Sequence, residues 1–211
     1  TTKNFIENKY KKDGFYKAKA HINTIPDTTD GHNVKMLVTI DRGEKVKIRK
    51  INITGNEQFS DKSLRKAMSN TKVQNPIRIF KKSKFIKEKY EEDLESILNK
   101  YKSKGYRDAR ITSDTVYMNE EKNKLEIAIN VEEGNKYYFG NIKFLGNSVY
   151  SDRVLSDILG IKKGEVYNGV LLEERIANPK KPDGEDLTNL YQNSGYLFSK
   201  VTPVEVKTSN D

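Results

Sequence analysis

The feature that most constrains this chain is an internal repeat with a period of about 91 residues. Three segments carry a tyrosine four residues before a glycine and an aromatic residue just after it: Tyr10 to Phe15, Tyr101 to Tyr106 and Tyr191 to Tyr196. Their glycines lie 91 residues apart (105 − 14) and then 90 (195 − 105). Because an isoleucine or leucine precedes each tyrosine by four residues, each segment predicts the end of an amphipathic helix that a glycine terminates.

Two further motifs recur at the same offset. Gly55-Asn56 recurs as Gly146-Asn147, and Ser60-Asp61 recurs as Ser151-Asp152, each 91 residues later. Agreement between independent motifs indicates tandem copies of one structural unit.

One unit can be followed from end to end. We predict a strand over 45–54 with an irregularity at Arg49-Lys50, a helix that begins at Ser60, and a second helix over 86–104. A strand over 107–118 and a strand over 124–132 follow, the latter with alternating Leu125, Ile127, Ile129 and Val131. The unit is therefore strand, helix, helix, strand, strand.

The other copies are incomplete in this chain. Residues 1–43 form the C-terminal part of a repeat, with hairpin strands near 15–25 and 34–41, and residues 44–134 form the complete one. Residues 135–211 form a repeat that lacks its last strand: we predict strands over 137–144 and 197–206 and two helical stretches, the second broken by residues 178–184.

The composition favours several small modules over one large globule. Only 35% of the 211 residues are hydrophobic and 33% are charged, which leaves little apolar mass for a single core. The chain has no cysteine, and this excludes disulfide scaffolds, zinc–thiolate sites and thiol nucleophiles. A net charge of +9 favours an anionic surface or an acidic partner, or a soluble lysine-rich surface.

The repeated unit resembles the polypeptide-transport-associated (POTRA) domain of BamA-type outer-membrane assembly factors. The helix-end glycines carry the likeness, together with the strand ends 51–56 and 142–147, which share an "I-x-[FI]-x-G-N" pattern. The resemblance implies an α+β fold of tandem βααββ repeats, each a three-stranded mixed sheet covered on one face by two helices. It also implies a periplasmic scaffold that binds unfolded outer-membrane proteins and accessory lipoproteins, and that precedes a C-terminal β-barrel of the same protein.

The resemblance places the second strand of the unit at the edge of the sheet. The unpaired backbone groups of an edge strand can accept an extended polypeptide as an additional strand. The predicted polypeptide-binding residues are Ala109, Arg110, Ile111, Thr112, Ser113, Asp114, Thr115 and Val116. Pro203 fits an edge position in the equivalent strand of the last repeat, either as a binding edge or as protection against pairing.

The lysines Lys81, Lys82, Lys84 and Lys87 are a possible contact for an anionic surface, although solvated lysines beside anchoring aromatic residues are the simpler interpretation.

We predict no catalytic site, metal or cofactor. His21 and His32 are solvent-facing hairpin residues without metal-ligand spacing, and the acidic clusters 91–93 and 120–121 are solvated charges.

A nucleic-acid-binding array of KH-like modules is the alternative. The Gly-x-x-Gly clamp that such modules need is absent between the two helices, so net charge is the remaining support and we expect no nucleic-acid partner.

Overall fold

A computed structural model describes residues 1–26, 33–74, 85–121, 123–181 and 183–208. The chain divides into two compact units, the first made of Thr1–Leu98 with Arg110–Glu133 and the second of Asn99–Ala109 with Gly134–Asp211. Each unit is described by itself.

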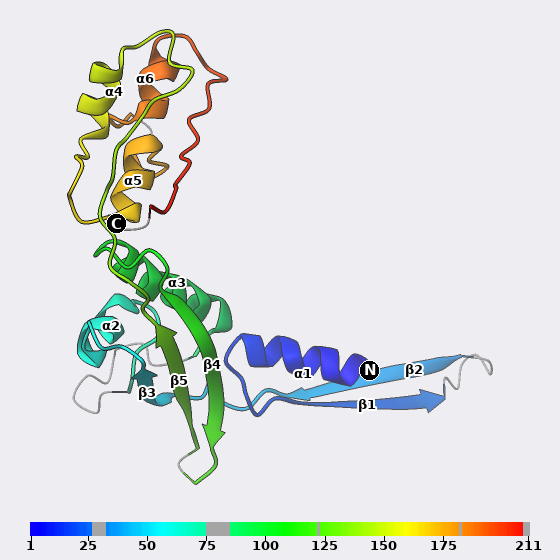
Figure 1. The fold of residues 1–211 in the computed structure, drawn as a ribbon. Coiled ribbons are helices and arrows are strands. Elements are labelled where there is room, and N and C mark those ends of the chain that lie inside the picture. Colours follow the sequence, from blue (N-terminus) through cyan, green and yellow to red (C-terminus); the bar gives the residue numbers. More distant parts are fainter. Residues whose placement is uncertain (27–32, 75–84, 122, 182, 209–211) are drawn as a thin grey trace. The chain divides into compact units, whose positions relative to one another are not determined.

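The first unit begins with a helix and a hairpin (Figure 1). Helix α1 (Thr2–Lys12) lies beside strand β1 (Lys19–Pro26), which pairs antiparallel with β2 (Val34–Asp41). The Glu7 carboxylate accepts a hydrogen bond of 3.1 Å from the Ala20 backbone N–H and so joins the helix to β1. The hairpin confirms the two predicted strands, although the first begins at Lys19 and not near residue 15.

A three-stranded mixed sheet forms the rest of the first unit. Its order is β3 (Ile48–Thr54), β5 (Lys124–Glu132), β4 (Arg110–Asn119), with β3 parallel and β4 antiparallel to β5. Helices α2 (Asp61–Ala67) and α3 (Lys87–Lys102) lie on one face of the sheet (Figure 1). The predicted βααββ unit and its mixed sheet are confirmed.

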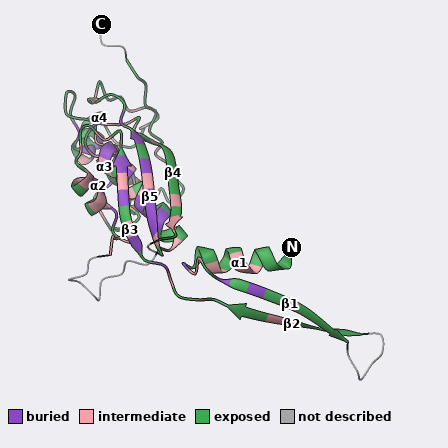
Figure 2. Ribbon diagram, turned by 90° about the horizontal axis from the view of Figure 1, so that it is seen from below, coloured by how far each residue is buried: buried purple, intermediate pink, exposed green. Residues whose placement is uncertain are grey.

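Alternating residues of β5 direct the core to one face of the sheet. Leu125, Ile127, Ile129 and Val131 are at most 3% exposed, and buried residues gather on β3 and β5 (Figure 2). The predicted irregularity in β3 is a register shift between Ile48 and Lys50. Helix α2 begins where the sequence predicts, because the Ser60 hydroxyl accepts a hydrogen bond from the Ser63 N–H.

The acidic cluster 91–93 on α3 was predicted to be solvated, and this prediction is wrong for Asp93. Asp93 is fully buried, and its carboxylate accepts backbone N–H bonds from Asn70 (3.1 Å) and Thr71 (2.5 Å). A buried carboxylate is stable when such donors surround it, so Asp93 holds the chain that follows α2 against α3.

The second unit is built from three short helices. Residues Leu155, Leu159, Ile161, Ile176 and Leu187 form its core, from helices α4 (Asp152–Leu159), α5 (Gly169–Ile176) and α6 (Leu187–Asn193) and the adjoining chain. Residues 177–186 separate α5 from α6, as the predicted break at 178–184 requires. The buried Asp186 accepts N–H bonds from Asn178 and Asn189 and so ties this loop to α6.

The strands predicted over 137–144 and 197–206 do not form among the described residues; an isolated bridge between Tyr138 and Val166 is the strand-like pairing recorded there. In the first unit the outer strands β3 and β4 do not pair with each other, and each pairs with the central strand β5. Among the described residues, segments 137–144 and 197–206 have no such central strand between them.

The repeat extends to individual hydrogen bonds. In the first unit the carbonyl of Gly14 accepts from the Val46 N–H at 3.2 Å. In the second unit the carbonyl of Gly105 accepts from the Tyr137 N–H at 2.8 Å, with both residues 91 positions later. Both glycines have left-handed φ values, +92° and +103°, so the helix-end motif is also the point where the next repeat begins.

Gly55 and Gly146 are a matched pair for testing the fold. Both have positive φ (+76° and +78°), but a Cβ on Gly55 would lie 2.0 Å from the Val131 carbonyl, whereas a Cβ on Gly146 meets nothing within 4 Å. We expect Gly146→Ala to cost about 1–2 kcal/mol of backbone strain and Gly55→Ala to cost clearly more, because β5 must also shift. Urea unfolding followed by circular dichroism measures both; equal losses would contradict the contact between Gly55 and β5.

Candidate functional site

Strand β4 is an edge of the three-stranded sheet. Its partner is β5, and no other described segment pairs with it. Of the eight predicted edge residues, Arg110 to Val116 lie within β4 and Ala109 immediately precedes it. One side of the β4 backbone is therefore open to another strand.

The opposite edge, β3, is partly occupied by its own module. The carbonyl of Ile48 accepts from the Gln74 backbone N–H at 2.8 Å, and the carbonyl of Ile51 accepts from the Arg65 guanidinium at 3.2 Å. Since these acceptors are already used, β4 is the better candidate for binding an added strand.

The two faces of β4 differ in chemistry. By register, Ile111, Val116 and Met118 lie opposite buried residues of β5 and share the helix-covered face with Asp114. Side chains on the uncovered face are polar or aromatic: Ser113, Thr115 and Tyr117. A strand added to β4 would meet a mainly apolar row on one face and a mainly polar row on the other.

A bulge marks the beginning of β4. The register with β5 shifts between Ile111 and Ser113, and the Thr112 hydroxyl donates to the Asn130 carbonyl at 3.2 Å. Just before the bulge, Arg110 donates twice to a single carboxylate oxygen of Glu132, at 2.7 and 3.1 Å. The bulge bends the first residues of β4 and leaves 113–119 as the regularly paired stretch.

A polar cluster occupies the uncovered face of the same sheet. Glu126 of β5 is 6% exposed and accepts hydrogen bonds from Arg49 (2.5 Å), Asn119 (2.8 Å) and the Tyr117 hydroxyl (3.2 Å). Burial acts to raise the pKa of Glu126, but these donors, Arg49 first, outweigh it and hold the pKa below its ordinary value. The cluster thus links β3, β5 and β4.

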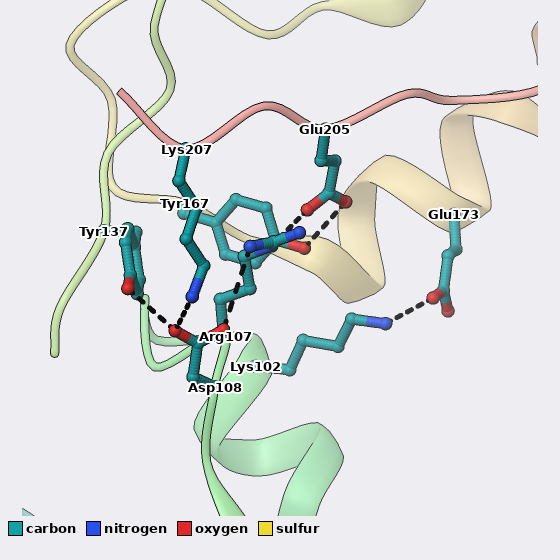
Figure 3. A network of polar contacts seen from close by, with 8 residues as sticks. All are labelled: Lys102, Arg107, Asp108, Tyr137, Tyr167, Glu173, Glu205 and Lys207. Carbon is teal, nitrogen blue, oxygen red and sulfur yellow. Dashed lines mark hydrogen bonds and ion pairs between the residues drawn. The ribbon is translucent and has the colours of Figure 1, made fainter. Parts of the chain in front are cut away.

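A second polar network lies within the second unit (Figure 3). Arg107 forms an ion pair with Glu205, and the Tyr167 hydroxyl donates to the same carboxylate at 3.1 Å. Burial, with the Glu205 charge, raises the pKa of Tyr167 to about 12. The C-terminal segment is therefore held although it forms no strand.

Asp108 provides a second attachment point for that segment. Its carboxylate pairs with Lys207 at 2.5 Å and accepts from the Tyr137 hydroxyl at 2.7 Å (Figure 3). The bonds from Lys207 and Tyr137 lower the pKa of Asp108.

A shallow recess of about 580 Å³ adjoins this network. Each of its charged side chains already has an ion-pair partner, and that of Lys102 is Glu173, so among the described residues the recess offers no unpaired charge to a ligand. The lining residues are Lys102, Arg107, Asp108, Tyr167, Pro203, Glu205 and Lys207.

The remaining predicted sites have different outcomes. Lys81, Lys82 and Lys84 lie outside the described residues, and Lys87 forms an exposed ion pair with Glu91 at 3.5 Å. His21 is exposed on β1, and His32 is also outside the described residues. Within the described ranges, no group of three or more potential ligands could hold a metal ion, and no helix is long and apolar enough to cross a membrane.

Sequence reasoning missed the Glu126 cluster and the Arg107–Glu205 network. Glu126 is one of the polar residues that alternate with the apolar residues of β5, and this pattern predicts a solvated side chain. No local pattern indicates that Arg49, 77 positions earlier, bonds its carboxylate. One signal could have suggested the ion pair between Arg49 and Glu126. Glu126 lies opposite the irregularity in β3, and such an irregularity changes the direction of a side chain such as Arg49.

The fold and the open edge define tandem α+β modules built around a small mixed sheet. A model of the POTRA family, described as "Surface antigen variable number repeat", matches residues 46–134 and 137–211. The chain therefore belongs to the POTRA family. This assignment selects POTRA modules over the KH-like alternative.

Named relatives agree with the family assignment. The outer membrane protein assembly factor BamA of Neisseria meningitidis serogroup B is 26% identical over 189 residues, which cover 88% of this chain and 23% of that protein. A putative outer membrane protein assembly factor of Treponema pallidum is 24% identical over 181 residues, 84% of this chain and 20% of that protein. The chain thus spans between a fifth and a quarter of the length of these relatives.

A solved structure has the same fold. The crystal structure of Haemophilus influenzae BamA POTRA3-5 matches with a TM-score of 0.50 and 20% identity, and the match covers 81% of this chain and 63% of that one.

The lowered pKa of Glu126 predicts a pH dependence of stability. A carboxyl group whose pKa is lower in the folded than in the unfolded state stabilises the fold above its unfolded pKa of about 4.3, and this contribution is lost as the pH falls through the folded pKa. We expect the urea midpoint of the wild type to fall more steeply below about pH 5 than that of Glu126→Gln, so that the two curves converge in acid. Parallel curves would show that Glu126 does not depend on these donors.

The attachment of the C-terminal segment can be tested by limited proteolysis with a non-specific protease. We expect the double change Glu205→Ala and Lys207→Ala to speed cleavage within residues 198–207 while the α4–α6 core stays intact, because the ion pairs hold the segment and not the core. Lys200→Ala is the matched control, since Lys200 is exposed and forms no ion pair with any residue within the described ranges. An unchanged cleavage rate in the double variant would contradict the attachment.

Proposed function

We propose that these modules are part of a periplasmic polypeptide-binding scaffold in an outer-membrane β-barrel assembly machine. Membership of the POTRA family and likeness to proteins named as outer membrane protein assembly factors support this role. The scaffold acts by binding and not by catalysis.

The mechanism is addition of an extended client segment to β4. The observation that carries it is the asymmetry of the two sheet edges: acceptors on β3 are bonded within the module, whereas β4 pairs on one side with β5 alone among the described strands. Pairing through backbone N–H and C=O groups depends weakly on client sequence. That tolerance suits a receptor for many different unfolded outer-membrane proteins.

The same edge or other module surfaces hold accessory lipoproteins of the assembly complex, and a C-terminal β-barrel of the same protein anchors the array. Both partners follow from the resemblance to POTRA domains of outer-membrane assembly factors and are part of the proposal. The proposal also includes contact of Lys81, Lys82, Lys84 and Lys87 with an anionic surface.

A proline pair tests the accepting edge. Replacing Thr112 and Ser113 with Pro removes two consecutive backbone N–H groups at the bulge, where a strand tolerates proline best. Because successive N–H groups of a strand point to opposite sides, the pair ensures that a donor on the open side is lost whichever residue carries it. We expect a fluorescein-labelled peptide of alternating apolar and polar residues to bind at least about tenfold more weakly in fluorescence anisotropy, since tenfold corresponds to one or two lost hydrogen bonds.

The matched control is Thr112→Ala with Ser113→Ala, which removes the same side chains and keeps both N–H groups. Circular dichroism of each variant establishes that the sheet is intact. If the folded proline variant binds the peptide as tightly as the alanine variant does, β4 is not the accepting edge.

A further inference from the structure

Asp114 interrupts the apolar face of the binding edge. In register it lies opposite Ile129, which is 1% exposed, and the neighbouring position on the same face is Val116. Asp114 itself is exposed. A carboxylate therefore stands on the rim of the helix-covered face, in the middle of the stretch that an added strand would cover.

A buried hydroxyl lies beside this carboxylate. Tyr90 of α3 is 2% exposed and packs against Phe85 with ring centroids 5.3 Å apart. Burial, together with the charge of Asp114, raises the pKa of Tyr90. The Tyr90 hydroxyl approaches the Asp114 carboxylate, but no hydrogen bond of standard geometry joins it to that carboxylate or to any other residue that the structure describes. A buried hydroxyl that is so weakly bonded gains from a better-placed partner on binding.

We propose that Asp114 and the Tyr90 hydroxyl form a subsite that selects a lysine or arginine at one inward-facing position of the bound strand. Residues directly opposite each other on paired strands have Cβ atoms about 4.5–5.5 Å apart, which is within reach of an ion pair. A lysine or arginine there pairs with Asp114 and can donate to the Tyr90 hydroxyl, whereas an acidic side chain meets a like charge.

The neighbouring inward positions of the bound strand prefer apolar side chains. In one direction from Asp114, the next residue of β4 on the same face is Val116. In the other direction, beyond the bulge, it is Ile111. The preferred client segment therefore carries a cation between two apolar residues on the same face. This inference rests on the proposed addition of clients to β4.

Peptides that differ at one position test the subsite. Two labelled peptides of alternating sequence, uncharged apart from one inward-facing Lys or Glu, are titrated against the 211-residue protein by fluorescence anisotropy. We expect the wild type to prefer the Lys peptide by about fivefold, as a favourable cross-strand charge pair allows. The preference should disappear in Asp114→Asn, reverse in Asp114→Lys and shrink in Tyr90→Phe.

Glu121→Lys is the matched control, because it makes the same change of charge in the turn after β4 and should leave the preference for the Lys peptide intact. Thermal unfolding of each variant identifies any that fails to fold. The affinities of Asp114→Asn are interpreted once this measurement shows that the variant is folded.

The outcomes separate the subsite from the edge itself. Equal binding of both peptides to the wild type overturns the subsite and leaves strand addition intact. Tighter binding of both peptides by Asp114→Asn also overturns it, because an inward-facing charge on an edge strand would then serve to prevent pairing. If the wild type binds neither peptide, or if the proline pair in β4 changes neither affinity, the proposed function fails.

Discussion

The pairing of β5 with both of its neighbours is the interaction on which the described modules depend. β5 supplies the buried row Leu125, Ile127, Ile129 and Val131, aligns β3 in parallel and leaves β4 with one side open. Segments 137–144 and 197–206 have no central strand between them among the described residues, and they do not form strands. The module's architecture and its candidate binding edge therefore have the same origin.

The two edge strands of the sheet, β3 and β4, differ in how far their outer backbone groups are bonded within the module. Helix α2 and the chain after it supply donors to β3, whereas the outer side of β4 pairs with no other described strand. Bulges at Ile48/Lys50 and Ile111/Ser113 bend both edge strands. Since a bulge increases local twist and ends regular pairing, these features restrict unspecific association while one stretch of β4 stays available.

Much of the fold could be predicted from the sequence because its signals are local or periodic. The Ser60 cap, the alternation of β5 and the 91-residue spacing all lie within short windows or repeat between copies. The edge position of β4 came from family resemblance, since periodicity alone does not order strands in a sheet. The burial of Asp93 and Glu126 and the attachment of Glu205 could not be predicted, because each depends on at least one partner that lies 22 to 98 residues away.

β5 is the middle strand of the sheet but the last element of its module in the chain. Ile48 pairs with Leu125, 77 residues later (125 − 48), so a chain that emerges with its N-terminus first exposes β3 and β4 before either has a partner. Pairing over such separations is slow to form. During its own synthesis each module is for a time an unpaired, extended polypeptide, and in that interval it is as prone to aggregation as the strands that it is proposed to receive.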